Sequence, residues 1–197
     1  MALIPLGRIA RLQIQRSKLK LGEKPNRVYD PAPLLSVDEL TITPQGALAR
    51  LPDGGMVVDV HHAAHPATRN SGGHNDLSVG FTAHYTAMRA EYGEHLDDGC
   101  AGENILVAAD ESVPLERVAG GLVIQPAAGG APVRLENVRV DLPCVEFSRY
   151  ASRSAEAEAV RRALQFLDHG RRGYYCTFEG TKPALVAVGD EVFTCGA

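Results

Sequence analysis

Cys144 is the first residue whose type and position suggest chemistry. It directly follows Pro143, at the end of an alternating run from Val133 that predicts a half-buried strand. Proline suits a strand end because it lacks a backbone donor. A thiol just past such an end is held in place and can reach a cleft, whereas most free cysteines are small buried apolar residues. Position alone leaves both interpretations open.

A histidine-rich segment covers residues 61–75 and contains His61, His62, His65 and His74. Its polar, glycine-rich and aperiodic sequence predicts a long loop, and such loops are often functional. His62 and His65 have the H-x-x-H spacing of zinc or iron ligands. However, no predicted helix fixes these imidazole rings. Asp59 is the one carboxylate at an obvious spacing for a further metal ligand. We therefore expect a loop that is solvated or donates hydrogen bonds to a ligand, rather than a dedicated metal site.

The stretch Gly99–Asn104 reads GCAGEN. Its two glycines let the backbone approach a ligand closely. Glu103 could serve as an acid, a base or an acceptor, and Asn104 offers both donors and acceptors. The alternative is a tight turn into a strand, with Asn104 bonded to its own backbone. The stretch is not a phosphate loop, because it has no lysine and no predicted helix follows it.

Other catalytic templates find little support. The four cysteines, Cys100, Cys144, Cys176 and Cys195, form no C-x-x-C pair. No Gly-x-Ser-x-Gly, Ser-x-x-Lys or His-Glu-x-x-His motif is present, so a hydrolase is not indicated. Arg139 and Arg149 lie near Cys144 in sequence and could supply the cation that stabilises a reactive thiolate.

The elements that must position these residues are mostly short strands. We predict strands over residues 7–15, 37–43, 47–50, 56–60, 104–107, 118–125, 133–142, 173–178 and 185–193. Helices are predicted over 82–95, with Thr82 as N-cap, and over 154–168. Residues 17–33 read as a loop or an irregular edge. Many strands and two helices without βαβ alternation predict a mainly β (α+β) domain closed into a barrel or sandwich.

Composition sets further bounds. With 197 residues, 45% hydrophobic and 22% charged, the chain suits one globular domain spanning 1–197, with residues 1–36 partly irregular. The net charge of −4 and the lack of a long basic run argue against nucleic acid as a partner. The N-terminus has no apolar run long enough for a signal peptide or a membrane span. Reduced thiols in the cytoplasm are therefore expected.

Taken in order, these pieces resemble a known family. The histidine and glycine loop precedes a helix with Tyr85 and Gly93, then the GEN turn, Leu142-Pro143-Cys144, Gly173-Tyr174-Tyr175 and finally Val188-Gly189-Asp190-Glu191-Val192. This order resembles the MOSC domain, the C-terminal domain of molybdenum cofactor sulfurases, from about Val37 to Phe193. The resemblance implies a stand-alone MOSC domain with a closed or nearly closed β-barrel and a cleft.

The resemblance also implies roles for residues. Cys144 would occupy the position of the functional cysteine, which ligates the metal of molybdenum cofactor (molybdopterin) or carries sulfur as a persulfide. Glu103 and Asn104 would line the same cleft and share its catalytic role. The residues expected at the cofactor are the cations and loop residues Arg69, His62, His74, Asn75 and Arg149.

Three functions remain open at this stage. The chain could bind molybdenum cofactor and reduce N-hydroxylated small molecules with electrons from a separate reductase. It could instead carry sulfur on Cys144, supplied by a separate pyridoxal-phosphate-dependent cysteine desulfurase. It could also be a module of the same fold that binds another ligand without catalysis. Whether the protein is an enzyme is therefore not decided by its sequence, and neither is a pairing of Cys100 with Cys144.

Overall fold

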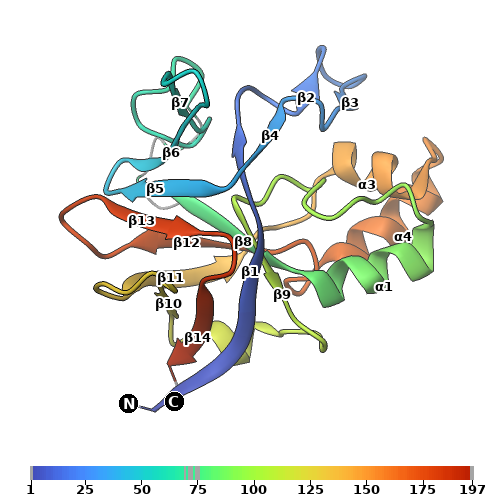
Figure 1. Ribbon diagram of the computed structural model, residues 1–197. Coiled ribbons are helices and arrows are strands. Elements are labelled where there is room, and N and C mark those ends of the chain that lie inside the picture. The colour runs from blue at the N-terminus through green and yellow to red at the C-terminus, as the bar shows by residue number, and fades with distance from the viewer. Residues whose placement is uncertain (1, 69, 71–72, 74–75, 196–197) are drawn as a thin grey trace.

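A closed β-barrel forms the centre of the protein (Figure 1). The computed structural model describes residues 2–68, 70, 73 and 76–195. The barrel strands are β1 (Leu3–Gln15), β8 (Leu77–Phe81), β9 (Ile105–Ala108), β10 (Leu122–Gln125), β11 (Val133–Val140), β12 (Tyr174–Phe178) and β14 (Glu191–Cys195). Their order is β14-β10-β11-β12-β8-β9-β1, and β14 also pairs with β1, which closes the ring. The barrel confirms the predicted fold class.

Strand β1 is the longest strand and the seam of the barrel. It pairs antiparallel with β14, β9 and also β4 (Leu34–Val37). Its buried residues Leu6, Ile9, Leu12 and Ile14 do not keep a strict period of two. The register shifts between Pro5 and Gly7 and between Ile9 and Arg11 explain this. Each irregularity changes the phase of the strand, so that apolar side chains return to the interior.

Further elements surround the barrel. A second sheet has the order β13-β5-β6-β7, from β5 (Glu39–Thr43), β6 (Gly46–Arg50), β7 (Met56–Val58) and β13 (Ala184–Ala187). The short strands β2 (Lys20–Leu21) and β3 (Val28–Tyr29) form a small hairpin. The helices are α1 (Thr82–Tyr92), α2 (Leu115–Val118), α3 (Val145–Ser152) and α4 (Ala157–Leu167). Among the described residues, no helix is both long and apolar enough to cross a membrane.

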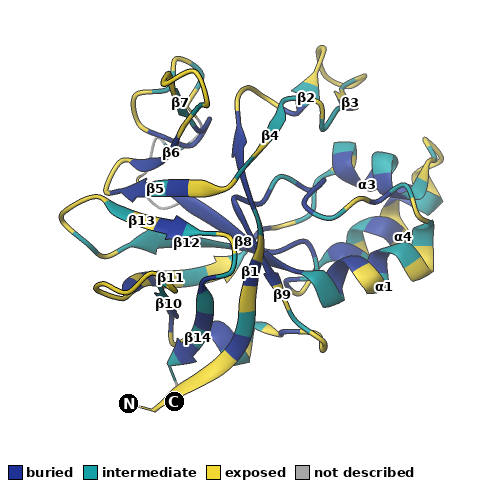
Figure 2. Cartoon of the chain, viewed as in Figure 1, coloured by how far each residue is buried: buried dark blue, intermediate teal, exposed yellow. Residues whose placement is uncertain are grey.

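Two apolar clusters hold this arrangement together. The first fills the barrel with side chains such as Leu12, Val79 and Tyr174. The second packs α1, α3 and α4 with the β2–β3 hairpin and includes Tyr29, Tyr85 and Phe147. In Figure 2, helices α1 and α4 each carry both buried and exposed residues. The second cluster therefore fixes α3 and the hairpin relative to the barrel end.

Several predicted elements were wrong in detail. The prediction of two helices missed α2 and α3, although Phe147 and Ala151 of α3 have helical spacing and are buried. Strand β8 was not predicted, because all five of its residues are buried and it shows no alternation. The strand predicted over 185–193 is two strands, β13 and β14, separated by a turn at Gly189. The N-cap of α1 is Phe81, and the Thr82 hydroxyl bonds Ala109 instead.

The close approach of β1 to β9 gives a test of the barrel seam. Gly7 has φ of 152°, and a Cβ there would lie 1.8 Å from the carbonyl oxygen of Ala108. Gly7→Ala should therefore lower the free energy of unfolding by about 3 kcal/mol or more, measured by urea denaturation. Gly129→Ala is the control, since its φ is 84° and its Cβ meets no atom within 4 Å. That change should cost only about 1 kcal/mol, and equal losses would contradict the steric argument.

Candidate functional site

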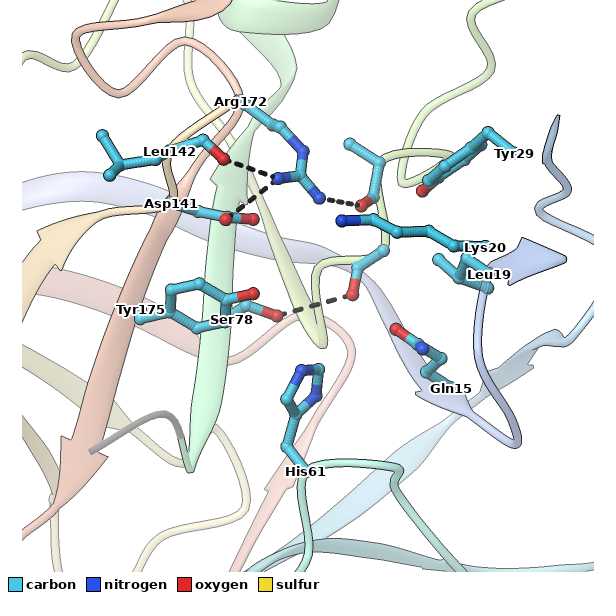
Figure 3. A pocket seen from close by; sticks show the side chains of 12 residues that line it. Gln15, Leu19, Lys20, Tyr29, His61, Ser78, Asp141, Leu142, Arg172 and Tyr175 are labelled. Carbon is cyan, nitrogen blue, oxygen red and sulfur yellow. Dashed lines mark hydrogen bonds and ion pairs between the residues drawn. The ribbon is translucent and has the colours of Figure 1, made fainter. Parts of the chain in front are cut away.

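A polar cavity of about 220 Å³ lies at one end of the barrel. Its lining side chains come from segments that enter or leave the barrel strands and from the β2–β3 hairpin (Figure 3). The lining residues are Gln15, Leu19, Lys20, Tyr29, His61, Ser78, Ala101, Gly102, Asp141, Leu142, Arg172 and Tyr175. In Figure 3 the polar ends of Lys20, His61 and Arg172 face this common space. The interior of the barrel is apolar, so the polar groups gather at its end.

An almost buried ion pair forms one wall of the cavity. Nη1 of Arg172 lies 2.9 Å from Oδ1 of Asp141, and the two side chains are only 9% and 11% exposed. The same nitrogen donates to the carbonyl of Leu142 at 3.0 Å, and Nη2 donates to that of Ala101 at 3.4 Å. Burial alone would lower the pKa of Arg172, but the carboxylate of Asp141 raises it. The guanidinium therefore stays charged and joins the segments before β12 and after β11.

For Asp141 burial is the stronger effect, so the pKa of its carboxyl group is raised. Burial raises the pKa of its carboxyl group, and the nearby charges of Arg172, His61 and Lys20 lower it, as does a hydrogen bond with Tyr175. These four residues come from three segments of the chain, since Arg172 and Tyr175 both lie near the start of β12. Breaking the pair would leave a charge in a poorly solvated place, which typically costs several kcal/mol.

A second buried carboxylate, Asp59, is completely inaccessible and lies behind the lining residues Gln15 and His61, to which it is hydrogen-bonded. It accepts hydrogen bonds from the backbone of Gln15 at 2.7 Å and the amide of Asn104 at 2.8 Å. Its other oxygen lies 2.9 Å from both the backbone nitrogen and Nδ1 of His61. His61 is thus held with its ring in the cavity, edge-on to Tyr175 at 5.9 Å between centroids.

Glu103 and Asn104 lie directly behind the cavity, next to its lining residue Gly102. Oε2 of Glu103 accepts a hydrogen bond from the Tyr85 hydroxyl at 2.7 Å, while Oε1 has no partner among the described residues. Burial raises the pKa of Glu103 to about 7, although the bond from Tyr85 opposes this. Glu103 therefore keeps its proton to a higher pH than an exposed glutamate does.

Cys144 lies beside the cavity, two residues after Leu142 in the segment that also carries Asp141. It is the N-cap residue of α3, is partly exposed and packs against the second apolar cluster. Its charge is one of the influences that raise the pKa of Arg172, so the two side chains are electrostatic neighbours. The carboxyl group of Glu146, in the first turn of α3, is a neighbour too, since a hydrogen bond with Cys144 helps to lower its pKa.

The remaining predicted site residues are more scattered. His62 is buried and does not line the cavity, and its Nδ1 accepts a hydrogen bond from the backbone of Ala64. Arg149 of α3 donates to the carbonyl of Pro25 in the β2–β3 hairpin, away from the lining residues. Arg69, His74 and Asn75 lie outside the described residues. Within the described part of the chain, no three His, Cys, Asp or Glu side chains converge as metal ligands.

Comparison with known families agrees with this architecture. The sequence matches the MOSC domain family over residues 66–193, which is more than half of the chain. The protein belongs to the MOSC domain family. A search of curated protein sequences finds no significant match.

Solved structures of similar fold support the assignment. YuaD from Bacillus subtilis has 14% identity and a TM-score of 0.57, with 96% of each chain covered. YiiM from Escherichia coli has 15% identity and a TM-score of 0.53, covering 96% of this chain and 70% of the other. YiiM from Geobacillus stearothermophilus has 11% identity and a TM-score of 0.53, covering 95% and 75%. At such low identities the similarity concerns the fold alone.

Sequence reasoning missed the principal charged groups of this MOSC domain's cavity. Arg172 and Asp141 are 31 residues apart, and neither lies in a recognisable motif. His61 was seen only as one of several loop histidines. Its spacing to Asp59 was the available signal, because a carboxylate two residues before a histidine can accept from its Nδ1.

The buried carboxyl group of Glu103 predicts a pH-dependent stability. Its folded pKa of about 7 exceeds the ordinary value of 4.5, so stability is complete below about pH 4.5 and falls as the pH rises through 7. The difference corresponds to on the order of 3 kcal/mol. Relative to wild type, Glu103→Gln should therefore gain up to that amount between about pH 4.5 and about pH 8, measured by urea denaturation.

Tyr85→Phe provides the opposing comparison. It removes the hydrogen bond that lowers the pKa of Glu103, so it should extend the loss of stability to higher pH. If the difference between wild type and Glu103→Gln stayed constant across the range, the perturbed titration of Glu103 would be refuted.

Proposed function

We propose that this MOSC protein binds molybdenum cofactor, with the Cys144 thiolate as the metal ligand at the rim of the cavity. The observation that carries the proposal is the position of Cys144 at the start of α3, beside Arg172 and on the segment that lines the cavity. A soft thiolate suits molybdenum, and the cation Arg172 lies close to Cys144.

The residues present fit the anionic end of such a ligand. Lys20 and Arg172 line the cavity and offer donors to a phosphate. A volume of about 220 Å³ is below the usual range for a whole small-molecule ligand, so the cavity would hold one end of the cofactor or a small substrate. Arg69, His74 and Asn75 stay proposed contacts on the basis of the family resemblance.

In this proposal the cofactor supplies two-electron transfer, and the chain binds, orients and protonates. Arg172 and Lys20 would bind the ligand, and His61 would face it. N-hydroxylated small molecules are the proposed substrates, and a separate reductase is the proposed electron donor. We place this activity in the cytoplasm, where thiols stay reduced.

A second candidate function has support from the surface around Cys144. Leu142 and Val145 flank the partly exposed thiol and are themselves 68% and 41% exposed. Exposed apolar side chains beside a reactive residue are typical of a protein contact. Cys144 could therefore accept sulfur from a cysteine desulfurase as a persulfide, with pyridoxal phosphate bound only by that partner.

Substitution of Cys144 tests the first proposal. Wild-type protein purified from its native host should contain about one molybdenum atom per chain, and Cys144→Ser should lose at least about 90% of it, because serine is a poor ligand for a soft metal site. Inductively coupled plasma mass spectrometry and the fluorescence of released pterin measure both. Cys195→Ser is the matched control, since Cys195 is also partly exposed but lies on β14.

The same preparation separates the alternatives. A mass gain of one sulfur atom on Cys144, lost on reduction, would support the persulfide carrier instead. Protein with neither molybdenum nor added sulfur would contradict both thiol functions and leave a module that binds another ligand.

A further inference from the structure

The ring of His61 is the part of the cavity that is best arranged for proton transfer. Its Nδ1 lies 2.9 Å from Oδ1 of Asp59, and its backbone nitrogen donates to the same oxygen. Because this oxygen already accepts from the backbone N–H of His61, it is an acceptor for the ring as well, and the neutral ring carries its proton on Nδ1. The lone pair of Nε2 is then directed into the cavity (Figure 3), and no described residue makes a hydrogen bond to it.

Asp59 is itself fixed by Asn104. Nδ2 of Asn104 donates to Oδ2 of Asp59 at 2.8 Å, and its Oδ1 accepts from the backbone of Ser78 at 3.1 Å. Both side chains are at most 1% exposed. Asn104 therefore connects strand β8 to the carboxylate that orients His61. The GEN turn can thus position His61 without touching the ligand.

The other ionisable groups of the cavity are less suited to this task. Asp141 is paired with Arg172 and bonded to Tyr175. Lys20 lies 3.9 Å from the carboxylate of Glu146. Glu103 lies behind the lining, where its Oε1 would be only 2.6 Å from a Cβ at Gly80. Glu103 is only 3% exposed and does not line the cavity.

We propose that His61 is the proton-transfer residue of this cavity and that Asp59 and Asn104 are its positioning residues. The inference rests on the proposed reduction of N-hydroxylated compounds, which is R–NH–OH + 2 e⁻ + 2 H⁺ → R–NH₂ + H₂O. The N–O bond breaks, and protonated His61 gives its Nε2 proton to the departing oxygen, which leaves as water. The second proton reaches nitrogen from solvent, and the separate reductase supplies both electrons. The Nδ1 proton of His61 stays on the ring, hydrogen-bonded to Asp59, and Nε2 takes up a new proton from water.

The tautomer of His61 tests the geometry without cofactor or substrate. In ¹⁵N-labelled protein at a pH where the ring is neutral, two-bond nitrogen–proton couplings should show Nδ1 protonated and Nε2 free. Asp59→Asn should shift the population toward the Nε2–H form, because an amide can donate to Nδ1. A neutral wild-type ring with its proton on Nε2 would overturn the inference, whatever the protein binds.

Activity tests the chemical role. With molybdenum-loaded protein, a reduced viologen dye as electron donor and an aryl amidoxime as substrate, His61→Gln should lower kcat by about 100-fold with a smaller change in KM. Added imidazole should restore part of the rate of His61→Ala, which a merely structural residue would not allow. His169→Asn, at an exposed turn, should keep the wild-type rate.

The outcomes separate the inference from the function on which it rests. Wild-type protein that reduces the amidoxime while His61→Gln stays within about 2-fold of its kcat would overturn the role of His61 alone, since general acids contribute far more. Loaded wild-type protein that does not reduce it would overturn the proposed reaction and the proton transfer with it.

Discussion

The buried carboxylate of Asp59 is the constraint on which the site depends. A charge that is fully removed from water is tolerated only when donors surround it. The donors come from the end of β1, from His61 and from the turn before β9, which carries Asn104. Gln15 and Asn104 are 44 and 45 residues away from Asp59 in the sequence, whereas His61 is only two residues away. Satisfying one carboxylate therefore positions three separate parts of the cavity at once.

The Arg172–Asp141 pair likewise holds together separate segments that line the cavity. It joins the segment that leaves β11 to the segment that enters β12, and its extra bonds reach Leu142 and Ala101. The guanidinium also lies over the ring of Phe147 in α3, at 5.3 Å from its centroid. The start of α3, and with it Cys144, is thereby tied to the polar cavity as well as to the second apolar cluster.

The sequence predicted the class of fold for identifiable reasons. Alternating runs and turn residues are local signals, so most barrel strands and α4 were found near their observed positions. Strand β8 was missed because it is buried on both faces and shows no alternation. Helix α3 was missed because the residues before it were read as the end of a strand. Cys144 and the GEN turn were proposed as site residues from their order along the chain, and the structure places them beside and behind the cavity. The partners Arg172 and Asp141 were not, since a pairing across 31 residues has no local signature.

The cavity bears on the choice between the two functions proposed for Cys144, metal ligand and persulfide carrier. A persulfide carrier needs an accessible thiol and a docking surface, and the exposed Leu142 and Val145 suit that need. It has no evident use for a polar cavity with an oriented imidazole. Maintaining Asp59 and Asp141 inside the protein costs desolvation free energy that a carrier would not recover. In the proposed binding of cofactor, Lys20, Arg172 and His61 would face one ligand in this cavity, and this use of the cavity favours that proposal over simple transport of sulfur.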